Sequence, residues 1–210
     1  KEYIISKNPN KIGINTSSYE KLADGLSKYH YDQLYNVLPS NYRKKLVSAE
    51  DLSIAWIETR TDLEMTIFAQ LVEISSSIIR EAFSTKVITP GITTTDDVVW
   101  WMREKVLDLG LDTWFHPSVD VQREDNSDLY AFDGLSKSDI IQPGDLIHCD
   151  FGITYLTLNT DTQELGYILK PGEVNAPDYL INALKEGNRV QDIFTNNFKQ
   201  GVTGNEILKK

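Results

Sequence analysis

Two aspartates eleven residues apart, Asp150 and Asp161, constrain the fold of this chain more than any other feature of its sequence. Asp150 lies near the end of an apolar run, 146–151, which is typical of a buried strand. Gly152 offers a bend, and the run 154–161 is rich in β-branched and aromatic residues. We therefore expect a buried antiparallel hairpin with one aspartate near the end of each strand.

Two carboxylates on one face of such a hairpin need a physical reason. Without a partner they repel each other and raise each other's pKa, and the burial of charge costs free energy. A hard divalent cation removes that cost, because it takes oxygen ligands from both carboxylates. The alternative is that Asp161 ends its strand in solvent while Asp150 accepts hydrogen bonds from turn amides. The spacing alone leaves both interpretations open, and a bulge at the bend would decide which face each side chain uses.

A resemblance to a known family rests on the segment 143–152, PGDLIHCDFG, with Asp161 after it. This pattern resembles the first half of the metal site in the creatinase/aminopeptidase P/methionine aminopeptidase family (M24). The resemblance implies that Asp150 and Asp161 are metal ligands and that the cofactors are two divalent metal ions (Mn, Co or Zn). It also implies that one His and two Glu complete the site beyond Lys210, and it assigns no catalytic residue within the chain.

The same resemblance implies an α+β fold, namely the first half of the "pita-bread" fold preceded by the tail of an amino-terminal α/β domain. We assign residues 1–58 to that tail, and residues 59–210 to the first part of the pita-bread metallopeptidase domain, incomplete at its carboxyl end. An internal repeat agrees with a fold of two similar halves, because residues 90–98 resemble residues 200–208 at an offset of 110.

Periodicity and capping signals predict the remaining elements. A capping box formed by Thr61 and Glu64 predicts the start of a long helix that reaches about Phe83. A turn and N-cap cluster at 90–97 predicts a second helix that Gly110 ends. The other predictions are a strand at 12–15, a helix at 19–29, a strand at 44–47 followed by a helix, strands at 114–121 and 164–169, a loop at 123–143, and a long helix at 176–198.

Composition excludes several classes of protein. A formal net charge of −10 argues against nucleic acid as the main partner, because phosphate binding needs a basic face. No run approaches the ~18 apolar residues of a membrane span. The single cysteine, Cys149, excludes an internal disulfide and a cysteine-based zinc cluster. A peptide substrate is the expected partner. The sequence leaves open whether the protein forms a homodimer. It also leaves open the compartment, which is either the cytoplasm or an exported location after removal of upstream residues.

The chain contains three histidines, and only one lies beside the aspartates. His148 is two residues before Asp150 and so shares its side of the strand. It either supports a metal ligand or is a hydrogen-bonded core histidine. We expect His30 to lie at the surface, and His116 is too far upstream to match a histidine of the family.

The resemblance implies a metal-dependent aminopeptidase or dipeptidase that acts on Xaa-Pro peptide bonds, and we expect these 210 residues alone to be inactive. Two departures from the family pattern bear on the substrate and on activity, and the first of them favours a different function. The family has a substrate-binding His about seventeen residues before its first metal aspartate, where this chain has Phe132-Asp133-Gly134. Thr162-Gln163 follows Asp161, where aminopeptidase P relatives usually show Thr/Ser-Arg. The alternative is a catalytically inactive pita-bread domain that acts as a peptide- or protein-binding module, and the retained aspartate pair argues against it.

Overall fold

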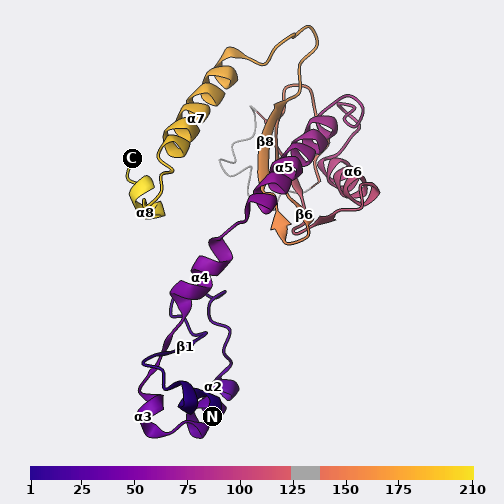
Figure 1. The fold of residues 1–210 in the computed structure, drawn as a ribbon. Helices are drawn as coiled ribbons and strands as arrows, with labels where there is room; N and C mark the ends of the chain where they lie inside the picture. Colours follow the sequence, from indigo (N-terminus) through magenta and orange to yellow (C-terminus); the bar gives the residue numbers. More distant parts are fainter. Residues whose placement is uncertain (124–137) are drawn as a thin grey trace. The chain divides into compact units, whose positions relative to one another are not determined.

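The computed structural model describes residues 1–123 and 138–210, which form two compact units, residues 1–65 and 66–210 (Figure 1). In the first unit, the predicted strands near residues 12 and 46 are present, and they pair with each other in parallel. The described elements of this unit are α1 (Glu2–Lys7), β1 (Ile12–Ile14), α2 (Lys28–Val37), α3 (Ser40–Arg43), β2 (Leu46–Ser48) and α4 (Glu50–Glu58).

The predicted helix at 19–29 is wrong, because this segment forms turns and α2 begins only at Lys28. Polar side chains bond to nearby backbone amides and hold the turns in place of a helix. Ser17 Oγ accepts a hydrogen bond from the Glu20 N–H at 2.9 Å, and Asp24 Oδ1 accepts one from the Ser17 N–H at 3.2 Å. Ser27 then caps α2 by accepting from the backbone N–H of its first turn.

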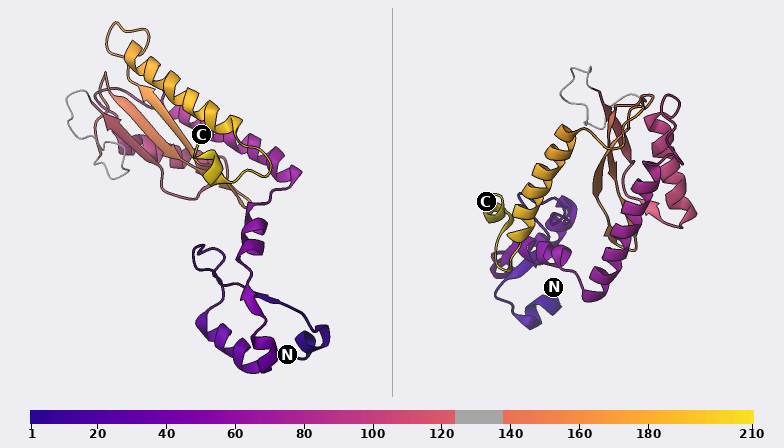
Figure 2. Two further views of the ribbon diagram at one scale, coloured as in Figure 1. Left: turned by 90° about the vertical axis from the view of Figure 1, so that its left-hand side faces the viewer. Right: turned by 90° about the horizontal axis from the view of Figure 1, so that it is seen from above.

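Two capped helices pack on one face of the main sheet in the second unit (Figures 1 and 2). The predicted capping box is present, since the Thr61 N–H donates to Glu64 Oε2 at 2.7 Å and the Glu64 N–H donates to Thr61 Oγ1 at 3.2 Å. A second capping box joins Thr94 and Asp97, and Gly110 follows the second helix at a φ of 69°. The helices are α5 (Asp62–Ala82), which crosses the boundary between the units, and α6 (Thr95–Asp108).

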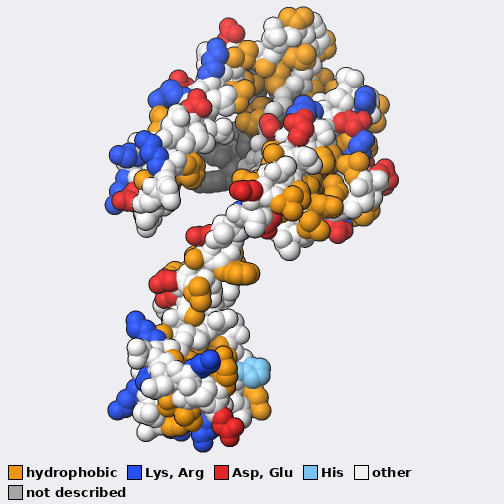
Figure 3. All heavy atoms as spheres, in the orientation of Figure 1, with side chains coloured by type: hydrophobic (Ala, Val, Ile, Leu, Met, Phe, Trp, Pro, Cys, Tyr) orange, Lys and Arg blue, Asp and Glu red, His pale blue; other side chains and the backbone are white. Residues whose placement is uncertain are grey.

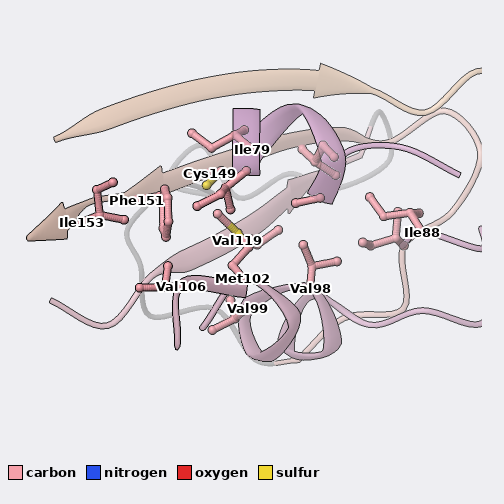
Figure 4. Close-up of a cluster of buried hydrophobic side chains, with 14 of the residues drawn as sticks. Ile79, Ile88, Val98, Val99, Met102, Val106, Val119, Cys149, Phe151 and Ile153 are labelled. Carbon is pink, nitrogen blue, oxygen red and sulfur yellow. The ribbon is translucent and has the colours of Figure 1, made fainter. Parts of the chain in front are cut away.

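The main sheet is antiparallel with the strand order β4-β5-β8, and a smaller sheet has the order β3-β6-β7. The core lies between the main sheet and the two helices (Figure 4). Its side chains include Ile79 from α5, Met102 from α6, and Val119, Cys149 and Phe151 from the sheet. The strands are β3 (Asp112–Thr113), β4 (Ser118–Gln122), β5 (Leu146–Phe151), β6 (Ile153–Tyr155), β7 (Leu158–Asn159) and β8 (Thr162–Tyr167).

The predicted pairing of 146–151 with 154–161 is wrong. Strand β5 pairs with β8, while the intervening residues form the small hairpin of β6 and β7. The Thr160 N–H donates to the Ile153 carbonyl at 2.9 Å. This hydrogen bond joins the two ends of the β6–β7 segment, so that β8 can then pair with β5. The sequence signal was misleading because β6 and β7 have strand-like composition but pair with each other and with β3.

The predicted strand at 114–121 begins later than expected. Strand β4 starts at Ser118, directly after Pro117, because proline has no N–H to donate to a ladder. The predicted loop at 123–143 falls largely on residues 124–137, which lie outside the described residues. Shortly after residue 137, Ile140 forms an isolated antiparallel bridge with Thr94.

The last elements are α7 (Asp178–Asn196) and α8 (Gly204–Ile207). Helix α7 has the amphipathic pattern that the sequence predicts, yet none of its residues is buried. Helix α8 begins with a capping box of Thr203 and Glu206, which repeats the box of Thr94 and Asp97 on α6. Thr94 and Thr203 are 109 residues apart, one fewer than the offset of 110 between Gly91 and Gly201. Both of these glycines have φ above 80°.

Many apolar side chains stay at the surface of both units, interspersed with charged ones (Figure 3). Trp56 in the first unit is 83% exposed and Trp100 in the second is 57% exposed. Among the described residues, no helix combines the length and the apolar character that crossing a membrane requires.

Candidate metal centre

The pleat of β5 directs Asp150 away from the helices. Ile147, Cys149 and Phe151 are at most 1% exposed and pack in the core, so the alternate residues His148 and Asp150 point to the opposite face. Asp150 is partly buried there, and its Oδ1 atom is fully buried without a hydrogen-bond partner among the described residues.

Asp161 comes directly before β8 and meets Asp150 on that face. Asp150 lies opposite Gln163 in the ladder, two residues beyond Asp161. The Asp150 carboxyl has a raised pKa, first because of burial and then because of the charge of Asp161, with a hydrogen bond between the two side chains as a further cause. The positive form of His148 acts in the opposite direction. The structure thus brings together the two residues that the sequence singles out.

Three further polar side chains lie around this pair. His148 Nε2 is 3.2 Å from Gln163 Oε1, and His148 Nδ1 is 4.0 Å from Asp120 Oδ2. Asp120 is 1% exposed and stands opposite His148 in the ladder of β4 and β5. His148 is therefore hydrogen-bonded and on the aspartate face at once. The sequence alone does not place Asp120 or Gln163 beside His148, because only the register between strands brings them there.

The remaining histidines lie elsewhere. His30 is exposed in the first unit, where its Nδ1 is 3.0 Å from Ser27 Oγ. His116 contacts α6, since its Nδ1 is 2.8 Å from Arg103 Nη1 and its ring meets Trp100 edge-on. The Phe132 region, where the family has its substrate-binding histidine, lies outside the described residues.

The chemistry of the aspartate pair fits a hard divalent cation. Two carboxylates offer the oxygen ligands that such ions prefer, and the buried Oδ1 of Asp150 is an acceptor with no donor in the described parts of the chain. Within the described part of the chain, no group of three or more His, Cys, Asp or Glu side chains is arranged to hold a metal ion. Asp150 and Asp161 therefore fit part of a coordination sphere, which needs ligands besides these two.

Comparison with known proteins assigns the family. The profile of metallopeptidase family M24 matches residues 67–210. The chain belongs to metallopeptidase family M24. The match covers the second unit, including both aspartates and the main sheet. A comparison with curated proteins finds no match.

Solved structures of this family share the fold. An X-Pro aminopeptidase from Thermotoga maritima superposes with a TM-score of 0.67 at 16% identity, over 98% of this chain and 53% of that one. A prolidase from Pyrococcus furiosus gives 0.64 at 18% identity, over 94% and 52%. An Xaa-Pro dipeptidase from Bacillus anthracis gives 0.62 at 18% identity, over 98% and 52%. The M24 chain spans about half the length of these structures, and the predicted first half of a pita-bread fold is confirmed.

Proposed function

We propose that the protein containing this chain is a metal-dependent peptidase that cleaves Xaa-Pro bonds, with Asp150 and Asp161 as ligands of two divalent ions. One observation carries the proposal: the two aspartates meet on one sheet face, and no described residue donates a hydrogen bond to a buried oxygen of Asp150. A cation there would satisfy that oxygen and offset the repulsion between the carboxylates.

The residues of the chain have distinct roles in this proposal. Bound divalent ions supply Lewis acidity and a nucleophilic water at neutral pH. Asp150 and Asp161 hold the ions in place on the rigid sheet. Burial and the charge of Asp161 raise the pKa of Asp150, and the charge of a protonated His148 partly opposes them, in the direction of the ionised carboxylate that a ligand must be. Gln163 Oε1 accepts a hydrogen bond from His148 Nε2, and this bond fixes the imidazole beside the site.

The proposed substrate class follows from the proteins that share the fold. Their names describe an X-Pro aminopeptidase, a prolidase and an Xaa-Pro dipeptidase. We propose the same bond for this protein, in a dipeptide or at the amino end of a longer peptide.

A binding module without catalysis is the second candidate function. The sequence favours it at one position, because Phe132-Asp133-Gly134 stands where the family has its substrate-binding histidine. The aspartate pair favours the enzyme, since a site without a cation gains nothing from two neighbouring acids, one of them partly buried.

Hydrolysis assays separate the two candidates. We expect the whole protein with added Mn²⁺ to cleave Xaa-Pro dipeptides or tripeptides, and Asp150→Asn to reduce kcat/KM on the order of 100-fold or more. Even substitutions outside the ligand shell cost 10–100-fold in activity or metal affinity. Asp112→Asn is the matched control, because Asp112 is exposed on β3, and it should leave the rate unchanged.

Two results would contradict the peptidase. One is peptide binding without hydrolysis in the presence of Mn²⁺, Co²⁺ or Zn²⁺, which supports the binding module. The other is hydrolysis that Asp150→Asn leaves intact, which removes the aspartate pair from the mechanism.

A further inference from the structure

Thr160, the residue before Asp161, is held by hydrogen bonds on the helix side of the sheet. It is 1% exposed. Its N–H donates to the Ile153 carbonyl at 2.9 Å, and its Oγ1 accepts from the Ile153 N–H at 3.0 Å. The same hydroxyl donates to Ser75 Oγ at 3.2 Å, and the Thr160 carbonyl accepts from Trp114 Nε1 at 2.7 Å. Every polar group of Thr160 therefore has a partner.

Ser75 connects both neighbours of Asp161 to helix α5. It is fully buried, and its Oγ lies 3.4 Å from Thr162 Oγ1 as well as 3.2 Å from Thr160 Oγ1. The two threonines that flank Asp161 thus meet one hydroxyl in the core. Since neighbouring side chains in a strand-like backbone point to opposite faces, this contact directs Asp161 to the face of Asp150.

The contact between Trp114 and Thr160 depends on a glycine. A Cβ atom at position 152 would lie 2.3 Å from the Thr160 carbonyl oxygen and 2.3 Å from Trp114 Nε1. No side chain fits there while the hydrogen bond is made. Gly152 therefore lets the indole reach the backbone one residue before Asp161.

A buried hydroxyl on the core face of α5 needs a reason. An alanine would fit the core stripe of Leu71, Ile78 and Ile79 without a polar group, whereas a serine hydroxyl costs free energy unless it is bonded. The partners of Ser75 are the residues on either side of Asp161. The network thus acts on the backbone that carries the candidate ligand.

We propose that Ser75, Thr160 and Trp114 are positioning residues for the metal centre, which fix the backbone around Asp161 so that its carboxylate faces Asp150. The proposal rests on the proposed function, because it concerns the ions that these two aspartates would hold. None of the three positioning residues touches the ions. Ser75 and Thr160 act from the helix side of the sheet, and Trp114 acts through the Thr160 carbonyl.

Paramagnetic broadening of amide NMR signals tests this role without an activity assay. Mn²⁺ added to the whole protein that contains this chain should broaden the Asp150 and Asp161 amide signals first. Thr160→Val keeps the shape and removes the hydroxyl, so we expect it to weaken Mn²⁺ binding by ~10-fold, the lower end for residues that support a ligand. Thr160→Ser keeps the hydroxyl and should restore binding.

Two serine variants on α5 give a second test of the positioning role and its control. Ser75→Ala should weaken Mn²⁺ binding as Thr160→Val does, and it carries the test if the valine variant fails to fold. Ser77→Ala is the control, because the Ser77 hydroxyl bonds only to the Ile74 carbonyl of its own helix. Circular dichroism and the amide spectrum of the second unit show whether each variant is folded.

The outcomes distinguish this proposal from the proposed function. Folded Thr160→Val and Ser75→Ala chains that bind Mn²⁺ like the unchanged chain would overturn the positioning role and leave the aspartate ligands intact. An unchanged whole protein in which Mn²⁺ leaves the Asp150 and Asp161 signals sharp would overturn the proposed function, and the positioning role with it.

Discussion

At the scale of single residues, Gly152 leaves less room for a side chain than any other described glycine. A Cβ atom there would overlap the Thr160 carbonyl, Trp114 Nε1 and the Phe115 ring, all within 2.6 Å. The conflict involves backbone as well as side chains, so rotamer changes cannot remove it. Position 152 therefore connects local packing directly to the geometry of the candidate metal centre.

We expect Gly152→Ala to lower the free energy of unfolding by about 1–3 kcal/mol, the usual cost of overpacking. Urea denaturation followed by circular dichroism measures it. Gly187→Ala is the matched control, because a Cβ atom there meets no heavy atom within 4 Å and alanine favours the helix. A Gly152→Ala chain as stable as the unchanged one would show that Trp114 does not hold the Thr160 carbonyl.

The sequence predicts the aspartate pair but not the residues that support it. Asp150 and Asp161 are visible because their spacing and flanking residues form a pattern within one short segment. Ser75 lies 85 residues before Thr160, and Asp120 meets His148 only through the register of two strands. Contacts of this kind depend on tertiary packing, which the local sequence does not contain.

At the scale of helices and strands, the signals for helix starts predicted the structure more reliably than strand composition predicted which strands pair. The capping boxes at Thr61 and Thr94 depend on residues three apart, so the sequence alone predicts where α5 and α6 begin. The pairing partner of β5 could not be predicted in this way. Strand composition favours 154–161 as much as 162–167, and the hydrogen bonds between Ile153 and Thr160 select the second.

The capping box of α6 makes the stability of the second unit depend on pH. The Thr94 backbone N–H and hydroxyl both donate to the Asp97 carboxylate, which lowers its pKa below the ordinary value. A carboxyl with a lowered pKa in the folded state stabilises that state above its ordinary pKa. This contribution disappears as the pH falls through the lowered pKa.

We therefore expect Asp97→Asn to lower the melting temperature at neutral pH, and the difference from the unchanged chain to shrink in acid. Thermal unfolding by circular dichroism across this pH range measures both. Asp96→Asn changes an exposed neighbour and leaves the capping box intact, so its effect should be smaller. A difference for Asp97→Asn that persists unchanged in acid would show that the ionised carboxylate does not stabilise α6.

At the scale of the whole molecule, the second unit divides its main sheet between packing and chemistry. Helices α5 and α6 cover one face and form the core, while the other face carries the two aspartates with His148 and Gln163. Membership of family M24 and the shared fold agree with this division. The formal net charge of −10 also favours the approach of cations over anions.

The central claim is that Asp150 and Asp161 together bind divalent ions, and anomalous diffraction from crystals of the whole protein soaked in MnCl₂ tests it most directly. We expect a manganese peak between the two carboxylates, within coordination distance of an oxygen from each. The same peak should be absent from crystals of Asp150→Asn soaked in the same way. Carboxylates on opposite faces of the sheet, or manganese bound only at other sites, would contradict the claim.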